Sequence, residues 1–194
     1  TLVNTTNAPI DVTYTVTPTY NYNGPTVGST YGGGIVAYIL QASDPGYVAG
    51  MTTALIVAPT DQSTGVPWYI DNVVVNSSSA SGVGTGLSNT NSIISTLTGL
   101  GANPNIYAAG IARNYTGGGY NDWFLPSLTE WQKIYQNVGP NASAPNTNVA
   151  VLNGSNTGYW SSTRWSTTRS YTPLANNLTD YSGNGWTGGY VRAA

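Results

Sequence analysis

The sequence predicts an α+β fold, in which short strands and a few helices share one domain. Two kinds of pattern support this prediction. Apolar runs and apolar–polar alternation are typical of strands, whereas apolar residues three and four positions apart are typical of helices. The strand patterns lie in residues 10–17, 35–40 and 54–58, and the helical patterns lie in residues 91–100 and 126–139.

The chain divides into an extended arm and one globular domain. Its 194 residues suffice for a domain that buries roughly 70% of the surface exposed by the unfolded chain. No charge run or proline-rich linker separates two apolar halves, so we expect residues 31–194 to fold as a single unit. Residues 1–30 precede this unit as an extended N-terminal arm with one strand.

The strand of the arm alternates strictly between two faces. Asp11 and several threonines occupy one face. The other face is apolar and is the expected assembly surface; it consists of Ile10, Val12, Tyr14 and Val16. Pro9 and Pro18 bracket the run, as prolines at strand ends do. The strand either pairs within its own subunit or adds to the sheet edge of a neighbouring copy.

Two buried strands open the globular domain. Residues 35–40 and 54–58 are continuous apolar runs, and a turn at residues 44–46 separates them. Residues 68–70 predict a short third strand. Glycine-rich runs lack the strand-to-helix context of a phosphate-binding loop, so we interpret them as turns. These runs are residues 32–34, 117–119 and 183–189.

Two helices are expected in the middle of the chain. Residues 91–100 carry isoleucines and leucines at helical spacing. A second helix is expected to start at Pro104, because proline is favoured in a first turn. This helix would bury Ile106 and place Arg113 near its C-terminal end, where a cation suits the helix dipole.

The clearest helix follows Pro126. Ser127 and Glu130 fit a capping box, in which the serine caps the helix and the glutamate reaches back to the cap. Apolar residues then recur at helical spacing until Gly139, which is expected to stop the helix.

Aromatic residues stand among glycines and polar residues in the C-terminal region, where short strands and turns fit the pattern. Exposed aromatic rings stack on sugars and pack against protein partners. The alternative is that they fill the core, since Phe124 is the only phenylalanine beside 15 tyrosines and 6 tryptophans. The candidate contact aromatics are Trp165, Tyr171, Tyr181 and Trp186.

Charge is scarce in this chain. Charged residues make up 6% of it, against about 25% in typical proteins. With a net charge of −2, little repulsion opposes contact between copies, which favours self-association. Five basic residues cannot neutralise a nucleic-acid backbone. No basic cluster indicates an anionic membrane surface, and no apolar stretch of 18 residues indicates a membrane span.

The composition also limits the chemistry. The chain has no cysteine and no histidine, which excludes disulfides, thiolate metal sites and histidine-based catalysis. Ser161 and Ser162 would need an adjacent base. The only lysine is Lys133, so a Ser–Lys pair is the one alternative to a structural role for these serines. We expect no catalytic residues and no enzyme activity.

Six short motifs in the globular domain occur together and in one order. They are GGIVAY (residues 33–38), LIVAPTDQSTG (55–65), GTGLSNT (84–90), YNDWFLPS (120–127), YWSST (159–163) and YVR (190–192). Together they resemble the DUF1566 family, which includes the C-terminal domain of a Legionella collagen-like adhesin. The resemblance covers about residues 31–192 and leaves out the arm.

This resemblance implies a C-type-lectin-like fold related to that of the formylglycine-generating enzymes. Such a fold has small twisted antiparallel sheets, two to three helices and long ordered loops. The resemblance also implies a bacterial surface protein that adheres or binds glycans. The chain departs from the pattern at Arg164, where the family often has an acidic residue. The catalytic cysteines of the enzymes have no counterpart here.

Calcium is the one metal that the resemblance brings into question. Asp122 and Trp123 lie in a segment with residue types that C-type lectins use for calcium, but a lone carboxylate is a poor site. We expect Asp122 to accept backbone hydrogen bonds and Trp123 to pack in the core. Calcium would otherwise need Asp44, Asp61 or Asp71 with backbone oxygens, and the scarcity of charge argues against it. No cofactor is expected.

The chain begins at Thr1 without an initiator methionine or a signal peptide. This favours a mature, secreted chain from which a leader was removed, with an arbitrary boundary as the alternative. We therefore predict a non-enzymatic structural protein of the cell surface. It would be the repeating subunit of a filament or layer, with itself as partner through strand addition. The alternative is a lectin-like adhesin head that binds a glycan or a host surface protein.

Overall fold

The computed structural model describes residues 24–69, 79–153, 158–166, 169–171, 182–184 and 189–194, with the backbone alone in residues 165–166, 169–171 and 182–184. Its strands are β1 (Thr30–Tyr31), β2 (Gly34–Ile39), β3 (Ala54–Val57), β4 (Ser63–Val66), β5 (Arg164–Ser166), β6 (Arg169–Tyr171), β7 (Ser182–Asn184) and β8 (Gly189–Val191). Its helices are α1 (Gly86–Gly99), α2 (Ala108–Asn114) and α3 (Leu128–Asn137), with 3-10 turns η1 (Pro104–Ile106) and η2 (Gly117–Gly119).

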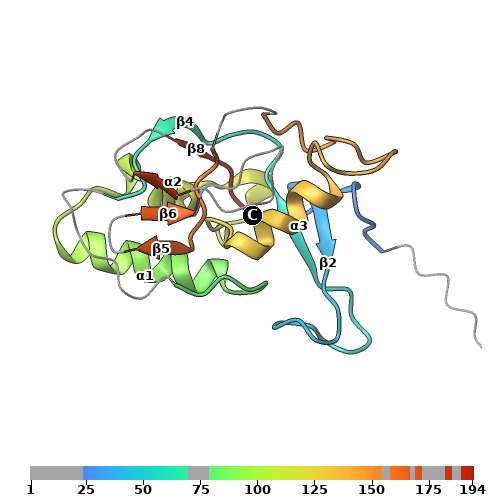
Figure 1. Ribbon diagram of the computed structural model, residues 1–194. Helices are drawn as coiled ribbons and strands as arrows, with labels where there is room; N and C mark the ends of the chain where they lie inside the picture. The colour runs from blue at the N-terminus through green and yellow to red at the C-terminus, as the bar shows by residue number, and fades with distance from the viewer. Residues whose placement is uncertain (1–23, 70–78, 154–157, 167–168, 172–181, 185–188) are drawn as a thin grey trace, which may run out of the picture.

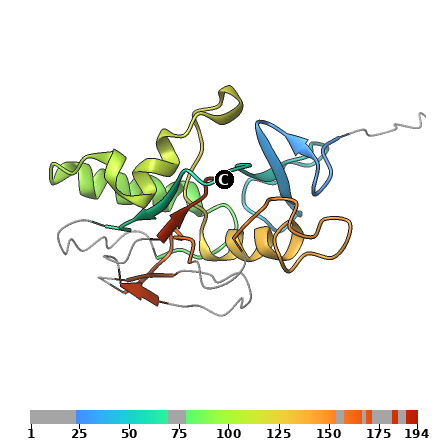
Figure 2. The same ribbon diagram turned by 90° about the horizontal axis from the view of Figure 1, so that it is seen from above.

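These elements confirm the predicted α+β class. The described strands form three small antiparallel sheets, in the orders β1-β2-β3, β4-β8 and β5-β6-β7. The β1-β2-β3 sheet lies on one side of the molecule and α1 and α2 lie on the other (Figure 1). The view from above shows the same separation, with the C-terminus near the middle (Figure 2).

The helix α3 packs on the β1-β2-β3 sheet. Side chains alternate along a strand, and Leu55 and Val57 of β3 turn to this side. Ala37 is the extra residue of a bulge in β2, and its carbonyl accepts a hydrogen bond from Asn137 Nδ2 at 2.9 Å. The buried cluster includes Ala37, Leu55, Val57, Trp131, Ile134, Tyr135, Val138 and Tyr159. The predicted strands at residues 35–40 and 54–58 are thus confirmed as β2 and β3.

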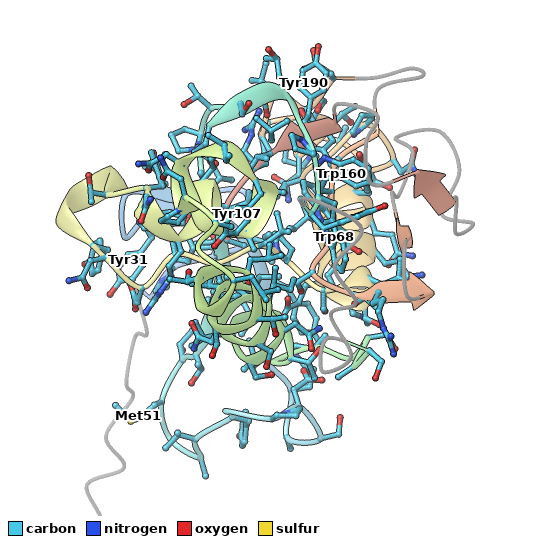
Figure 3. The ribbon with its side chains drawn as sticks, turned by 90° about the vertical axis from the view of Figure 1, so that its left-hand side faces the viewer. Tyr31, Met51, Trp68, Tyr107, Trp160 and Tyr190 are labelled. Carbon is cyan, nitrogen blue, oxygen red and sulfur yellow. The ribbon has the colours of Figure 1, made fainter. Side chains whose placement is uncertain are left out.

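A second cluster fills the space beside α1 and α2. Trp68, Tyr107 and Trp160 are fully buried there and lie near the middle of the molecule (Figure 3). Both indole N–H groups find a main-chain carbonyl: Trp68 donates to Ser161 at 2.8 Å and Trp160 donates to Val66 at 2.7 Å. A buried indole needs such a partner. Core packing therefore accounts for the described tryptophans.

The N-terminal end of α3 follows the sequence prediction. The Ser127 hydroxyl accepts from the Glu130 backbone N–H, and Glu130 Oε2 accepts from the Ser127 backbone N–H at 2.7 Å. The same carboxylate reaches a second helix, because Glu130 Oε1 accepts from the backbone N–H groups of Gly84 and Gly86. This contact supports the start of α1 at Gly86, five residues before the predicted start.

Two expectations in the middle of the chain are wrong. The predicted helix from Pro104 is broken into η1 and α2 at Tyr107, whose backbone is extended, and Ile106 is 49% exposed rather than buried. Arg113 does stand in the last turn of α2. Trp68 lies in the core but not in a strand. The strand β4 ends at Val66, and the next residue, Pro67, has no N–H with which to continue the ladder.

Two glycine-rich turns meet back to back. Gly33 and Gly118 both have positive φ, and a Cβ built at Gly33 would lie 2.6 Å from the Gly118 Cα. Only glycine permits this approach. The turn interpretation is correct for residues 117–119 and for the start of the first run. It is wrong at both ends of the third run, since Gly183 belongs to β7 and Gly189 to β8.

Candidate functional site

The residues predicted to mediate contacts fall mostly outside the described residues. This applies to the arm residues Ile10, Val12, Tyr14 and Val16, and to Tyr181 and Trp186. Trp165 and Tyr171 have a described backbone in β5 and β6, which are paired neighbours. Their side chains lie outside the described residues, so their role as contact aromatics stays a prediction.

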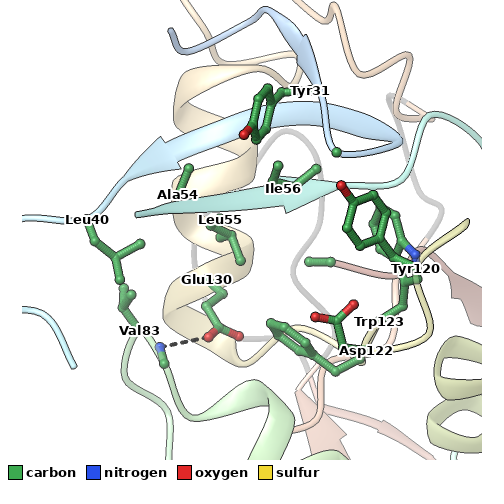
Figure 4. Close-up of a pocket in the computed structure, with 14 residues that line it drawn as sticks. Tyr31, Leu40, Ala54, Leu55, Ile56, Val83, Tyr120, Asp122, Trp123 and Glu130 are labelled. Carbon is green, nitrogen blue, oxygen red and sulfur yellow. Dashed lines mark hydrogen bonds between the residues drawn. The ribbon is translucent and has the colours of Figure 1, made fainter. Parts of the chain in front are cut away.

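A cavity of about 310 Å³ opens beside β3 (Figure 4). This size is at the lower end of the roughly 300–1,000 Å³ of pockets that take small ligands. Segments far apart in the sequence line it: Tyr31, Gly32, Leu40, Ala54, Leu55, Ile56, Val83, Gly84, Tyr120, Asp122, Trp123, Phe124, Glu130 and Ala194. We call this cavity, together with the outer edge of β3 at residues 54–56, the β3 groove.

The lining of the β3 groove is apolar and aromatic with two carboxylates. Tyr31 and Tyr120 are 56% and 50% exposed, so their rings are available at the rim. Trp123 is buried, and its indole N–H donates to Gly117 at 3.1 Å. None of the described lining residues is lysine or arginine. The groove therefore suits an uncharged or cationic occupant with apolar bulk.

The two carboxylates differ in environment. Glu130 is 1% exposed, and burial raises its pKa even though the backbone N–H groups of Ser127, Gly84 and Gly86 act to lower it. Asp122 is exposed, and we find no hydrogen bond from the described residues to it. The expectation that Asp122 accepts backbone hydrogen bonds is thus wrong, because its segment turns the side chain toward the groove (Figure 4). Trp123 packs in the core as expected.

The outer edge of β3 carries main-chain groups that point away from its partner β2. The Thr53 carbonyl accepts from Leu40, so residue 53 faces β2, whereas the Ala58 N–H donates to Ala193 and faces away. Groups alternate along an antiparallel strand. Ala54 and Ile56 must therefore face away from β2, and no described strand pairs with them there. This edge borders the cavity.

The C-terminal segment lies in line with this edge. Val191 and Ala193 accept hydrogen bonds from Gln62 and Ala58, so the segment runs antiparallel to residues 58–62. Ala194 faces the other side, as alternation along an extended segment requires, and exchanges two backbone bonds of 2.9 Å with Phe124. The line of this segment leads toward Ala54 and Ile56, which border the cavity together with Ala194.

A buried ion pair fixes the C-terminal segment beside the groove. Arg192 Nε donates to Asp61 Oδ1 at 2.6 Å, and its guanidinium also donates to the carbonyls of Ala58, Ala150 and Val151. The Asp61 carboxylate further accepts from Tyr159 and Asn153. This network joins three segments, and every group in it has a structural partner.

The aspartates considered for calcium do not gather in the structure. Asp61 is engaged by Arg192, and Asp44 accepts from the Tyr38 hydroxyl and the Gln41 N–H at 2.7 Å each. Asp71 lies outside the described residues. Within the described ranges, no three histidine, cysteine, aspartate or glutamate side chains form a group that could hold a metal ion.

No family model matches the chain, and no curated protein is detectably similar to it. Among the helices of the described segments, none has the length and apolar character needed to cross a bilayer.

Sequence reasoning missed the β3 groove. Tyr31 and Tyr120 stand in glycine-rich surroundings that gave no periodic pattern, and the open edge of β3 depends on which segments pair in space. One signal was present, since residues 120–127 are both polar and aromatic, a combination unusual for a plain turn.

Proposed function

We propose that this protein is a non-enzymatic extracellular structural or adhesive protein, the repeating subunit of a surface filament or layer. Copies join when the N-terminal strand of one adds to an open sheet edge of the next. In this proposal the globular part is a C-type-lectin-like domain of the DUF1566 type, and the chain is secreted.

The observation that carries this proposal is the open edge of β3. Main-chain groups of Ala54 and Ile56 face away from β2 and border an apolar cavity. An extended segment that pairs with such an edge gains main-chain hydrogen bonds, while alternate side chains fill adjacent pockets. The arm has a suitable alternating run, with the apolar face formed by Ile10, Val12, Tyr14 and Val16.

The low charge of the chain and the geometry of an arm contact both support assembly. Only 6% of its residues are charged, so copies approach with little repulsion. A contact between an arm and a different surface of the next copy is heterologous, and such contacts build open fibres when the rotation does not close a ring. The same low charge, in contrast, gives no basis for binding nucleic acid.

The test is deletion of residues 1–20. The shortened chain should stay folded and monomeric in sedimentation velocity, whereas the full chain should form large particles. A finer comparison keeps the length of the arm. Val12→Asp with Tyr14→Asp charges the apolar face and should abolish assembly, and Thr13→Asp with Thr15→Asp charges the other face and should not. Fibres from the shortened chain would refute the proposal.

The rim of the β3 groove favours a second candidate, a lectin-like head. Tyr31 and Tyr120 are exposed, and they line the same cavity as the exposed Asp122. Aromatic faces stack on sugars, and a carboxylate accepts hydrogen bonds from their hydroxyls. A glycan array with and without calcium tests this function. Hits that disappear in Tyr120→Ala would support it, and an array without hits would count against it.

A further inference from the structure

We infer that the β3 groove is the acceptor site for the arm: residues 10–17 of a second copy lie in it antiparallel to β3, with their apolar face turned to the cavity. This inference rests on the proposed function and names the surface that the proposed function leaves open.

The first step concerns which edge of the β1-β2-β3 sheet pairs with the incoming arm. The order β1-β2-β3 leaves two outer edges. The β1 edge is two residues long, and such short edges resist further pairing. The turn after it is also occupied by the contact between Gly33 and Gly118. The β3 edge is longer, bears the outward groups of Ala54 and Ile56, and borders a cavity.

The second step concerns direction. The C-terminal segment runs antiparallel to residues 58–62, and its line leads toward Ala54 and Ile56. An incoming strand that runs in the same direction as the C-terminal segment continues its line. The outward main-chain groups of Ile56 and Ala54 then bond to it as the Ala58 N–H bonds to Ala193. Its N-terminal end then meets Ala194. Pro9 precedes the run and has no N–H to donate, so the ladder of hydrogen bonds ends at Pro9.

The third step concerns side chains. Leu55 points toward Glu130 and the cavity, and Ala54 and Ile56 point to the other side of β3 (Figure 4). Side chains of paired strands that stand opposite each other share a face. The apolar arm face therefore joins the side of Leu55. The cavity holds two carboxylates and no described cation, and Asp11 is kept away from them on the opposite face of the arm.

The fourth step concerns which copy supplies the arm. The arm enters its own sheet at β1, and Tyr31 of β1 lies at the rim of the groove. The chain between residues 17 and 30 spans up to about 40 Å when extended, so the length of the arm does not decide between its own groove and that of a neighbour. The choice of a neighbour's arm rests on the proposed function, and closure of the disulfide within one chain is the result that would overturn it. The contact joins two different surfaces and repeats from copy to copy.

Disulfide trapping tests the acceptor site. The chain has no cysteine, so every disulfide would come from an introduced pair. Ala54→Cys and Ile56→Cys are each combined with a cysteine at position 11, 13, 15 or 17 of the arm. These positions share the Ala54 face, and paired strands bring Cα atoms within about 4.5–5.5 Å, a distance that suits a disulfide. Thr30→Cys on β1 is the matched control.

When Ala54→Cys is combined with a cysteine in the arm, we expect one arm position to give a ladder of disulfide-linked oligomers on a denaturing gel. Ile56→Cys should trap a position two residues nearer to the N-terminus, because the strands are antiparallel. Thr30→Cys should give no ladder. The inference is overturned if fibres form but only Thr30→Cys traps the arm, if neither β3 position traps it, or if the disulfide closes within one chain. Absence of assembly by the unsubstituted full chain would refute the proposed function itself.

Discussion

Among the aspartates that the structure describes, Asp61 should cost the most stability when it is replaced with asparagine. Asp61 is the ion-pair partner of Arg192, with 2.6 Å between Nε and Oδ1 and side chains that are 14% and 2% exposed. The guanidinium also donates to Ala58 and Ala150 at 2.9 Å and to Val151 at 3.3 Å. These carbonyls cannot neutralise its charge.

The magnitude follows from burial. Asparagine keeps one acceptor oxygen but no negative charge, so Asp61→Asn leaves the Arg192 charge buried and uncompensated. Breaking a buried pair in this way costs about 3–5 kcal/mol. Total stability for a domain is about 5–15 kcal/mol, so the variant loses a large part of it. For a chain of this size, that loss lowers the melting temperature by about 6–20 °C.

The assay is urea unfolding with calorimetry, and Asp44→Asn is the matched control. Asp44 accepts two hydrogen bonds of 2.7 Å, from Tyr38 and Gln41. These bonds lie at the surface, where water replaces a lost partner, so the control should lose little stability. If Asp61→Asn is no less stable than Asp44→Asn, the buried pair does not hold the C-terminal segment as we describe.

Two further predictions concern the groove and the glycine contact. Burial raises the pKa of Glu130 in the folded chain, so the folded state binds the Glu130 proton more tightly than the unfolded state does. The stability of the fold should therefore fall as pH rises from the ordinary pKa of 4.5 through the raised pKa of the folded state. Glu130→Gln should flatten this fall when melting temperature is plotted against pH, and an unchanged slope of that plot would contradict the prediction. Gly118→Ala should lower the free energy of unfolding in urea more than Gly119→Ala does. Both glycines have positive φ, and an alanine in that conformation costs about 1–2 kcal/mol. Only a Cβ at position 118 would also clash with Gly33, whereas a Cβ at position 119 would meet nothing within 4 Å. Equal losses would argue against the back-to-back turns.

Local patterns predicted the elements that depend on local physics. The capping box of Ser127 and Glu130 is complete within four residues, so the start of α3 could be read from the sequence. The apolar runs of β2 and β3 likewise reflect burial that each strand needs wherever it lies. The break at Tyr107 was missed because it serves tertiary contacts, such as the bond from the Ala108 N–H to Pro67.

The candidate site depends on contacts that no local pattern encodes. The start of α1 relies on the Glu130 carboxylate from another helix. That the main-chain groups of Ala54 and Ile56 face away from β2 follows from the bond between the Ala58 N–H and the Ala193 carbonyl. Both facts relate segments more than 40 residues apart in the sequence. The alternation in the arm predicted a strand that pairs with a sheet edge, but it did not indicate which edge.

The most direct test of the central claim is negative-stain electron microscopy of the full chain, prepared from its native source without denaturant, beside the chain that lacks residues 1–20. We predict regular fibres or sheets for the full chain and small separate particles for the shortened one. Small monodisperse particles in both preparations would contradict assembly by strand addition and would leave the lectin-like head as the function to pursue.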